Sequence, residues 1–573
     1  MRSKLQNIFG CDLRSLALFR MVLGLLLIAD LAVRLPDIVS FYTDAGLLPR
    51  AAAMASALPA GRLSFYFLNG STGYALVLFG ISALAALALA AGLFTRAAAA
   101  VSWLMLMSLH NRNILVDNAS SEFLRLLLFW SLFLPMGERF SVDRFLKPAP
   151  GGPQQRETSA ATAALLVQVA CVYFFTGLMK AEYEGWHTGA SLVLGIADEQ
   201  NSTPLAMMFL QHPALVAALG RGVLFLELAG PVLLFFPIKN LFFRAAALAG
   251  FLAMQAGIAL TLNVGLFPAI SMAAFLPFLP SEFWEALGGS SHAKEARRGP
   301  TWLARNFLAG ICLVYVLVYN LQSVKALHFR VPKPLQIFGH AAGLTQEWGM
   351  FAQLRGNLNW FVAWGRLENG QEMDLWKNRP VSWEKPTLIA PTYRNEQWRK
   401  YLNTTTKYYP RQLRYFTADA CRAWDAKHGE GEKLREAALY FLTRLRRPDG
   451  TYAPVKKLLL WKSPCSWDLG PRPGEMSERE KGGKLSALGE VKDGVRDGEW
   501  TFWYPDGGMK EHGYYQKGLQ TGFWQSWYQD AAPQEERYYN EGKAQGRWNR
   551  WPPQGGRPAS TCYDKGREVT CPG

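Results

Sequence analysis

Long apolar segments separated by short charged connections fill the first 325 residues, and this pattern constrains the fold more than any other feature. About 20 apolar residues in a row are enough to cross a bilayer as a helix. We expect about nine such helices, at residues 15–35, 74–94, 97–110, 122–136, 160–179, 221–238, 242–262, 265–280 and 302–322. Three of these segments are short for a span (97–110, 122–136 and 265–280), so eight or ten spans remain alternatives.

The distribution of basic residues predicts how these helices are oriented. With nine spans, most lysines and arginines of the connections fall on one face, which the positive-inside rule assigns to the cytoplasm. They include Arg2, Lys4, Arg14, Arg96, Arg139, Arg144, Lys147, Arg156, Lys239, Arg244, Lys294, Arg297 and Arg298, whereas the opposite connections hold only Arg50, Arg62, Arg112 and Lys180. We therefore expect the N-terminus inside and the C-terminal half outside, in a bacterial inner membrane.

Four of the seven cysteines lie in the C-terminal half, at Cys421, Cys465, Cys562 and Cys571. In an oxidising compartment, four cysteines permit two disulfides. The pair Cys562–Cys571 is favoured because it is local. The spacing shows no Cys-x-x-Cys or paired-histidine pattern, so we expect no metal site.

Residues 326–475 have a mixed pattern that predicts a small soluble α+β domain. The segment Trp360–Trp376 indicates a strand, an Asn-Gly turn and a second strand. Asn395–Thr405 and Glu432–Arg447 have the apolar spacing of helices. We assign residues 1–325 to the membrane domain and 326–475 to this second domain.

A repeat of 24 residues follows, and it predicts a stack of β-hairpins over 485–553. Glycine and tryptophan recur in register three times: Gly494, Gly498, Trp500 and Trp503; Gly518, Gly522, Trp524 and Trp527; Gly542, Gly546, Trp548 and Trp551. Such units stack because one alone cannot form a core. The phrases resemble the MORN-like repeats of a bacterial antitoxin-type family. The regular spacing favours a structural role for the tryptophans over stacking on nucleic-acid bases, and residues 554–573 form a tail.

The segment from Val172 to Gly189 is the first place to look for chemistry, because Lys180 follows directly after an apolar helix. A lysine beside hydrocarbon is costly unless it reaches water, a partner or the neutral state. Desolvation lowers the pKa of an amine, so such a lysine can serve as a base. The alternative is a lysine that extends from the helix end to the lipid headgroups.

Several phrases of the first half resemble the horizontally transferred transmembrane (HTTM) family, which is similar to the vitamin K-dependent γ-glutamyl carboxylase. They are Leu16–Arg50, Leu109–Asp143, the pattern YFxxGxxK that ends at Lys180, Glu227 in FLELAGP, and Leu344–Gln353. The resemblance implies that Lys180 is the catalytic base. It also implies further site residues around it: His110 as a second catalytic residue, and Asn111, Arg112, Trp186, His187 and Glu227 in substrate binding.

The resemblance implies reduced vitamin K or another quinol as cofactor, with O2 and CO2 and without metal. The enzyme would then be a carboxylase- or epoxidase-like lyase. The other polar residues of the spans, Arg20, Asp30, Glu122 and Arg125, either line the same pocket or pair with one another.

Two functions therefore remain open. The first is a membrane enzyme that acts on a quinol or another lipophilic substrate in the membrane. The second is a non-catalytic anchor that presents the repeats to an extracytoplasmic protein or envelope partner. Nucleic acid is not expected as a partner of either.

Overall fold

The computed structural model describes residues 2–55, 62–147, 155–288, 300–354, 356–409, 412–447, 450–466, 475–479, 485–553 and 556–571. The chain divides into two compact units. The first, called the helical unit here, comprises Met1–Ala45, Ala53–Gly356 and Ala390–Lys400. The second, called the β unit, comprises Gly46–Ala52, Asn357–Ile389 and Tyr401–Gly573.

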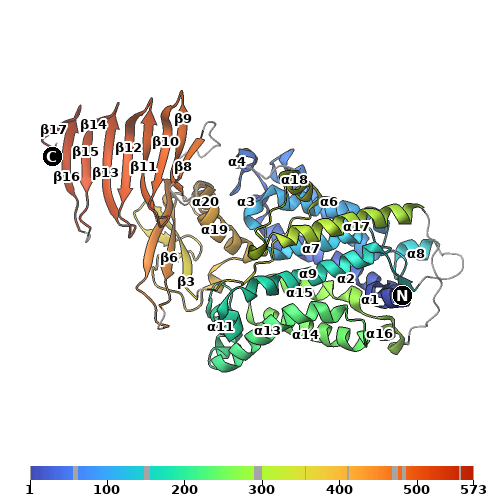
Figure 1. The fold of residues 1–573 in the computed structure, drawn as a ribbon. Coiled ribbons are helices and arrows are strands. Elements are labelled where there is room, and N and C mark those ends of the chain that lie inside the picture. The colour runs from blue at the N-terminus through green and yellow to red at the C-terminus, as the bar shows by residue number, and fades with distance from the viewer. Residues whose placement is uncertain are drawn as a thin grey trace. The chain divides into compact units, whose positions relative to one another are not determined.

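Six helices among the described residues are long and apolar enough to cross a membrane. They are α2 (Leu13–Arg34, continued by short turns to Tyr42), α5 (Thr72–Ala91), α9 (Ala160–Ala181), α13 (Pro213–Leu234), α14 (Asn240–Thr261) and α17 (Pro300–Leu321). Figure 1 shows α9, α13 and α14 running side by side in this unit. The expected class, a polytopic helical membrane domain followed by a β-rich part, agrees with this architecture.

The three short predicted spans correspond to shorter helices. These are α6 (Thr95–Arg112), α7 (Ala119–Ser131) and α15 (Phe267–Ala274). The 13 residues of α7 extend over about 20 Å, which is less than the thickness of a bilayer core. The sequence therefore located helices at all nine predicted segments, and six of these helices have the length and composition of a span.

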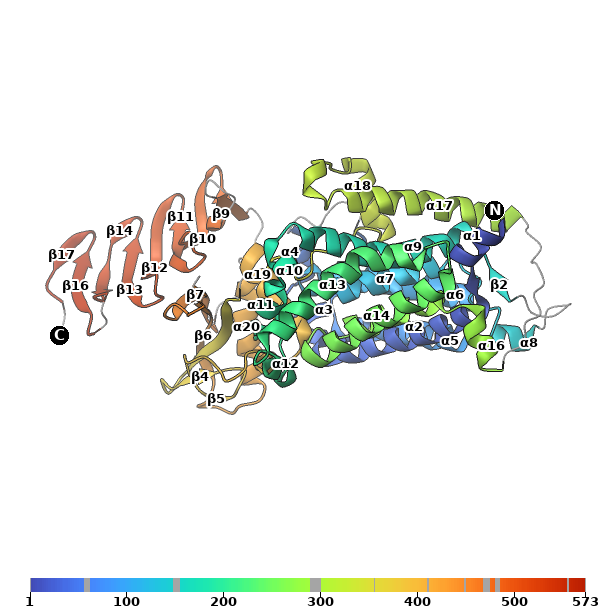
Figure 2. The ribbon, with the colours of Figure 1, turned by 60° about the horizontal axis from the view of Figure 1, so that its bottom comes forward.

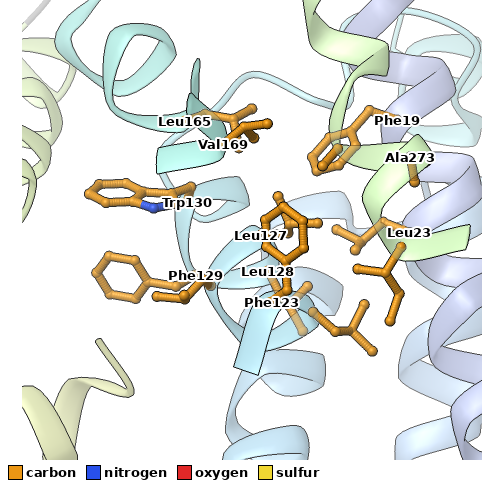
Figure 3. Close-up of a cluster of buried hydrophobic side chains, with 14 of the residues drawn as sticks. Phe19, Leu23, Phe123, Leu127, Leu128, Phe129, Trp130, Leu165, Val169 and Ala273 are labelled. Atoms are coloured by element: carbon orange, nitrogen blue, oxygen red, sulfur yellow. The ribbon is translucent and has the colours of Figure 1, made fainter. Parts of the chain in front are cut away.

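Helix α7 lies in the core of the helical unit. Its side chains from Phe123 to Ser131 are all buried. Figure 3 shows Phe123, Leu127 and Trp130 of this helix among apolar side chains of α2, α9 and α15. Because the apolar surface is buried all round, α7 needs no amphipathic pattern.

Short elements complete the helical unit. Their bounds are α1 (Arg2–Phe9), α3 (Ile38–Tyr42), α8 (Val142–Leu146), α10 (Glu184–Thr188), α11 (Ala190–Ala197), α12 (Pro204–Phe209), α16 (Ser281–Ala286) and α18 (Lys333–Ala342), with a two-stranded sheet of β1 (Cys11–Asp12) and β2 (Arg156–Glu157). Helix α4 (Arg50–Ala55) begins in the β unit and ends in the helical unit. Figure 2 shows α8 at one end of the long helices and α10 and α11 at the other.

The β unit begins with a five-stranded antiparallel sheet in the order β5-β4-β3-β6-β7. Its strands are β3 (Leu358–Leu367), β4 (Glu372–Asp374), β5 (Arg379–Pro380), β6 (Leu434–Arg444) and β7 (Lys456–Pro464), and helix α20 (Leu413–Asp425) packs on β6 and β7. The predicted hairpin is confirmed: β3 and β4 are joined through Asn369 and Gly370, and Gly370 has a φ of +88°. The predicted helix at 395–405 is confirmed as α19 (Glu396–Tyr408).

The predicted helix at Glu432–Arg447 is wrong, because this segment forms strand β6. Strand β6 is an inner strand of the sheet, paired with β3 on one side and β7 on the other. Its residues from Ala437 to Tyr440 are all buried. A strand covered on both faces carries a continuous apolar run, which periodicity alone does not distinguish from a buried helix.

The repeat region forms an antiparallel sheet of ten strands, in which neighbours follow chain order except that β13 pairs with both β14 and β15 (Figure 1). They are β8 (Glu475–Arg479), β9 (Leu485–Lys492), β10 (Val495–Trp503), β11 (Met509–Gln516), β12 (Leu519–Trp527), β13 (Pro533–Asn540), β14 (Lys543–Ala544), β15 (Gly546–Arg550), β16 (Ala559–Asp564) and β17 (Arg567–Val569). The predicted hairpin repeat is confirmed as an architecture. Residues 554–573, expected as a tail, contribute β16 and β17 to the same sheet.

The 24-residue period has a direct structural cause in the contact between tryptophan and glycine. The indole of Trp500 lies against Gly489 of the preceding strand, and Trp524 lies against Gly513 in the same way. A side chain at either glycine would collide with the ring. Each indole N–H donates to a backbone carbonyl at the same offset: Trp500 to Glu490, Trp524 to Tyr514 and Trp548 to Tyr538.

Both disulfides lie in the β unit. Cys562 is bonded to Cys571, which confirms the favoured local pair, and Cys421 is bonded to Cys465. The second bond joins α20 to the residue after β7, and therefore holds the helix on its sheet.

Candidate functional site

The spacing of the YFxxGxxK pattern brings α9 and α13 close together just before Lys180. Gly177 and Lys180 are three residues apart and therefore lie on one face of α9. A Cβ atom at Gly177 would be 3.1 Å from the Cβ atom of Glu227, on α13. Because glycine has no side chain, α13 approaches here, and Glu227 comes within reach of the lysine one turn further on.

Lys180 and Glu227 form a buried ion pair. The Lys180 Nζ atom lies 2.7 Å from Oε1 of Glu227. The two residues are 5 % and 4 % exposed. The second carboxylate oxygen, Oε2, is buried and has no hydrogen-bond partner among the described residues. A buried carboxylate oxygen without a donor is costly, so a donor from a ligand would be favourable here.

Trp186 covers the amine from another side. It belongs to α10, and the Lys180 Nζ atom lies 4.4 Å from the centre of its ring. The indole N–H donates to the backbone carbonyl oxygens of Phe351 and Ala352, at 3.2 and 3.1 Å. Gly189, directly after α10, has a φ of +83°, and a side chain there would collide with the backbone of Ala217 on α13. The Trp186-x2-Gly189 pattern thus fixes this short helix against α13.

A cavity of about 400 Å³ adjoins the ion pair. Its polar side chains are Lys180, Glu227, Trp186 and Thr261, and the rest of its wall is hydrocarbon or glycine. The wall consists of Lys180, Trp186, Leu192, Gly195, Ile196, Phe209, Val216, Leu219, Gly222, Val223, Leu226, Glu227, Gly250, Ala253, Met254, Gly257, Ile258, Thr261, Leu262, Phe351 and Leu354. Such a cavity suits a ligand with a large apolar body and one polar end.

Two glycines keep the cavity open. A Cβ atom at Gly222 of α13 or at Gly257 of α14 would meet no other atom within 4 Å. Gly250, Ala253 and Gly257 follow one another at intervals of three and four residues, so they share one face of α14. This spacing is present in the sequence and could have identified the wall, but it was not among the predicted features.

The segment Leu344–Leu354, called the strap here, closes the end of the cavity beside Lys180. Its Phe351 and Leu354 belong to the wall. The Thr176 hydroxyl of α9 donates to the carbonyl oxygen of Trp348 at 3.1 Å. The sequence resemblance pointed to this segment, and the structure places it at the site.

The other predicted site residues lie apart from this cavity. His110, Asn111 and Arg112 end helix α6, and none of them is in the described cavity wall. His110 is 1 % exposed, and its Nδ1 atom lies 4.0 Å from Oδ1 of Asp117. Asn111 donates to the carbonyl oxygen of Leu63, and Arg112 to that of Thr43.

His187 is exposed, although it is next to Trp186 in the sequence. Its Nε2 atom lies 2.8 Å from the carbonyl oxygen of Ala181. The structure therefore brings together three of the seven predicted site residues, namely Lys180, Trp186 and Glu227.

The remaining polar residues of the spans have partners elsewhere. Arg20 donates to carbonyl oxygens, including those of Met136 and Phe140. Arg34 pairs with Asp30 at 2.7 Å. Arg125 donates to the carbonyl oxygens of Gly343, just before the strap, and of Thr345, in the strap. No group of three histidine, cysteine or acidic side chains able to hold a metal occurs in the described ranges.

The apolar helices fit an integral membrane protein, and its helical unit holds a largely apolar cavity beside a buried lysine. A family model, the HTTM domain, matches residues 10–284. This match supports the assignment of the helical part to the HTTM family. Neither a curated protein nor a solved structure matches the chain significantly.

Proposed function

We propose that the helical unit is an enzyme that removes a proton from the polar end of a lipophilic substrate, with Lys180 as the base. The observation that carries the proposal is the ion pair of Lys180 and Glu227 at the polar end of an otherwise apolar cavity. The C-terminal half lies on the extracytoplasmic side in this proposal, as the bias of basic residues predicts.

Glu227 supplies a means to make the lysine basic. Apolar surroundings disfavour a pair of buried charges, so they favour transfer of one proton from Nζ to the carboxylate, which yields a neutral amine and a neutral acid. The amine can then accept a proton from a substrate hydroxyl. Most of the cavity wall is apolar and disfavours water beside the amine, which keeps the amine available for the substrate.

A quinol such as reduced vitamin K fits the residues that are present. Its ring and isoprenoid chain match the hydrocarbon wall, and its hydroxyl can reach the polar end of the cavity formed by Lys180 and Glu227. A quinol would supply an acidic hydroxyl and reducing electrons, with O2 and CO2 as co-substrates. Lys180 would accept the proton, Glu227 would orient the hydroxyl, and Trp186 would shield the amine.

The test uses the full-length protein in lipid vesicles, supplied with reduced vitamin K and oxygen. Lys180→Met removes the base, and we expect at least a hundredfold loss of quinol consumption. Gly257→Leu fills the cavity without touching the pair, so quinol binding should be lost as well. His187→Ala is the matched control, since His187 is exposed, and should retain activity. Unchanged consumption in Lys180→Met would contradict the proposal.

The alternative function is an anchor for the repeats. It is favoured by the ten-stranded sheet, whose exposed apolar side chains include Leu519 and Phe523. In that case Lys180→Met has no effect on function, and binding of the partner depends on the surface of the sheet. Leu519→Lys would then reduce capture of an extracytoplasmic partner and leave quinol chemistry unaffected.

A further inference from the structure

The helical unit has a second cavity, at the end of the long helices opposite Lys180. Its volume is about 420 Å³. It lies where α5 ends, α6 begins and α8 follows α7, and Figure 2 shows α8 at this end. Its wall comprises Leu93, Phe94, Thr95, Arg96, Ala97, Leu134, Met136, Gly137, Glu138, Asp143, Leu146 and Lys147. It shares no residue with the cavity around Lys180.

The two acidic side chains of this cavity are already engaged. Asp143 accepts hydrogen bonds from the backbone N–H groups of Phe94 and Thr95, at 2.7 and 2.8 Å, and from the Thr95 hydroxyl at 2.7 Å. Burial raises the pKa of Asp143, but these hydrogen bonds outweigh it, and the pKa is lower than that of an ordinary carboxyl. Asp143 therefore stays ionised as the cap of α6. Glu138 lies 3.8 Å from Arg144.

The two basic side chains of the cavity have no such partner. Within the described ranges, neither Arg96 nor Lys147 lies within ion-pair distance of an acidic group. Together with Arg144, which pairs with Glu138, the cavity and its edge carry three basic and two acidic side chains, and Arg96 and Lys147 are the two basic ones without an ion pair among the described residues. A site of this kind attracts an anion.

The rim of the cavity is apolar and exposed. Phe94 and Leu146 are 73 % and 63 % exposed, and Phe145, beside them on α8, is 84 % exposed. Such side chains would be unfavourable in water, but they suit the boundary between headgroups and acyl chains in a bilayer. Phe94 follows shortly after α5, which has the length and composition of a span.

We propose that this cavity binds the headgroup of an anionic phospholipid. Arg96 and Lys147 contact the phosphate, and Phe94 and Leu146 contact the start of the acyl chains. Basic pockets between membrane helices recognise anionic headgroups in this way. A free inorganic anion would contact the two basic side chains but not the apolar rim. The effect of changing the rim therefore distinguishes a phospholipid from inorganic phosphate.

The experiment uses the full-length protein in a mild detergent and native mass spectrometry. The probes are short-chain phosphatidylglycerol, short-chain phosphatidylcholine and inorganic phosphate. We expect phosphatidylglycerol to bind at least tenfold more tightly than phosphatidylcholine. The double variant Arg96→Gln/Lys147→Gln should lose that difference, whereas Arg96→Lys should keep it.

Two further variants decide between the possible causes. Lys239→Gln is the matched control, because Lys239 is exposed in the turn between α13 and α14 and lies outside the cavity wall. It should bind phosphatidylglycerol like the wild type. Leu146→Ser should weaken phosphatidylglycerol binding about tenfold.

Three outcomes would overturn the proposal. They are equal affinity for the two lipids, unchanged binding in the double variant, and binding of inorganic phosphate as tight as that of phosphatidylglycerol with no effect of Leu146→Ser. Both exchanged basic side chains are at the surface, so gel filtration should show the double variant folded like the wild type.

Discussion

At the scale of single residues, the pair of Lys180 and Glu227 is the most consequential contact of the helical unit. Each charge is buried, and each compensates the other at 2.7 Å. Removal of one partner leaves an uncompensated charge, whereas removal of both leaves an apolar site. The two kinds of variant should therefore differ in stability.

We expect Glu227→Leu to lower the free energy of unfolding by about 3–5 kcal/mol, because Lys180 then remains buried without its partner. The double variant Lys180→Met/Glu227→Leu should recover most of this loss. Thermal unfolding of the purified protein in detergent measures both. A double variant that is less stable than Glu227→Leu alone would contradict the view that the unpaired charge causes the loss of stability.

At the scale of secondary structure elements, close approach at glycine determines both the site and the repeats. Gly177 lets α13 approach α9, and Gly513 lets Trp524 lie on its neighbouring strand. In each case a position without a side chain brings a functional or structural side chain to its partner. Variants that add a side chain should act through that partner.

Gly177→Leu should push α13 away from α9 and separate Glu227 from Lys180. The overpacking costs about 1–3 kcal/mol, and the loss of the pair should reduce quinol consumption. Gly80→Leu on α5 is the control, because a Cβ atom there meets no atom within 4 Å. Thermal unfolding and quinol consumption are measured on both variants, and equal effects would contradict this account.

The repeats offer a matched pair of opposite variants. Gly513→Val should displace Trp524 and destabilise the sheet by about 1–3 kcal/mol. At the equivalent position of the next unit the chain has Arg537 instead of glycine, and Trp548 is only half-buried. Arg537→Gly should allow the Trp548 ring to pack against the glycine and become more buried. The emission of Trp548, obtained by subtracting the spectrum of a Trp548→Phe variant, should then shift to the blue. An unshifted spectrum would mean that the glycine does not govern the ring.

At the scale of the whole molecule, much of the organisation could be predicted because it depends on long or repeated patterns. The apolar segments located the helices, and the glycine–tryptophan spacing located the hairpins. The fourth turn of the series was missed: Lys565 and Gly566 continue the positive φ angles of Asp493–Gly494, Lys517–Gly518 and Glu541–Gly542. This last unit contains no tryptophan, so the glycine–tryptophan spacing could not predict it.

The candidate site was only partly predictable, for a physical reason. Lys180 and Trp186 are near each other in the sequence. A lysine at the end of an apolar helix is costly, so its position in the sequence alone marks it as a candidate site residue. The strap and one face of α14 belong to the site because they pack there in the folded protein. The apolar pattern of one segment does not indicate which other segment it packs against. His110 is buried, as the resemblance would require of a catalytic residue, but it lies outside the wall of the cavity around Lys180.

The two disulfides make a prediction for the β unit. Cys421–Cys465 closes a loop of 44 residues, and Cys562–Cys571 one of 9. In the chain-entropy model these loops correspond to about 4 and about 2.5 kcal/mol. Cys421→Ser/Cys465→Ser should therefore lower the free energy of unfolding more than Cys562→Ser/Cys571→Ser does. Chemical denaturation followed by tryptophan fluorescence compares them, and the reverse order would contradict the model.

The packing of Trp524 on Gly513 repeats that of Trp500 on Gly489, so the two hairpins share one packing plan, and the first also contacts β7 through Asp506 and Lys456. Excision of residues 494–517 would join Asp493 to Gly518 and set Trp524 upon Gly489, with every turn preserved. The array can consequently grow or shrink by whole modules without any repacking of the helices. The length of the repeat sheet can thus change while the helical unit stays the same.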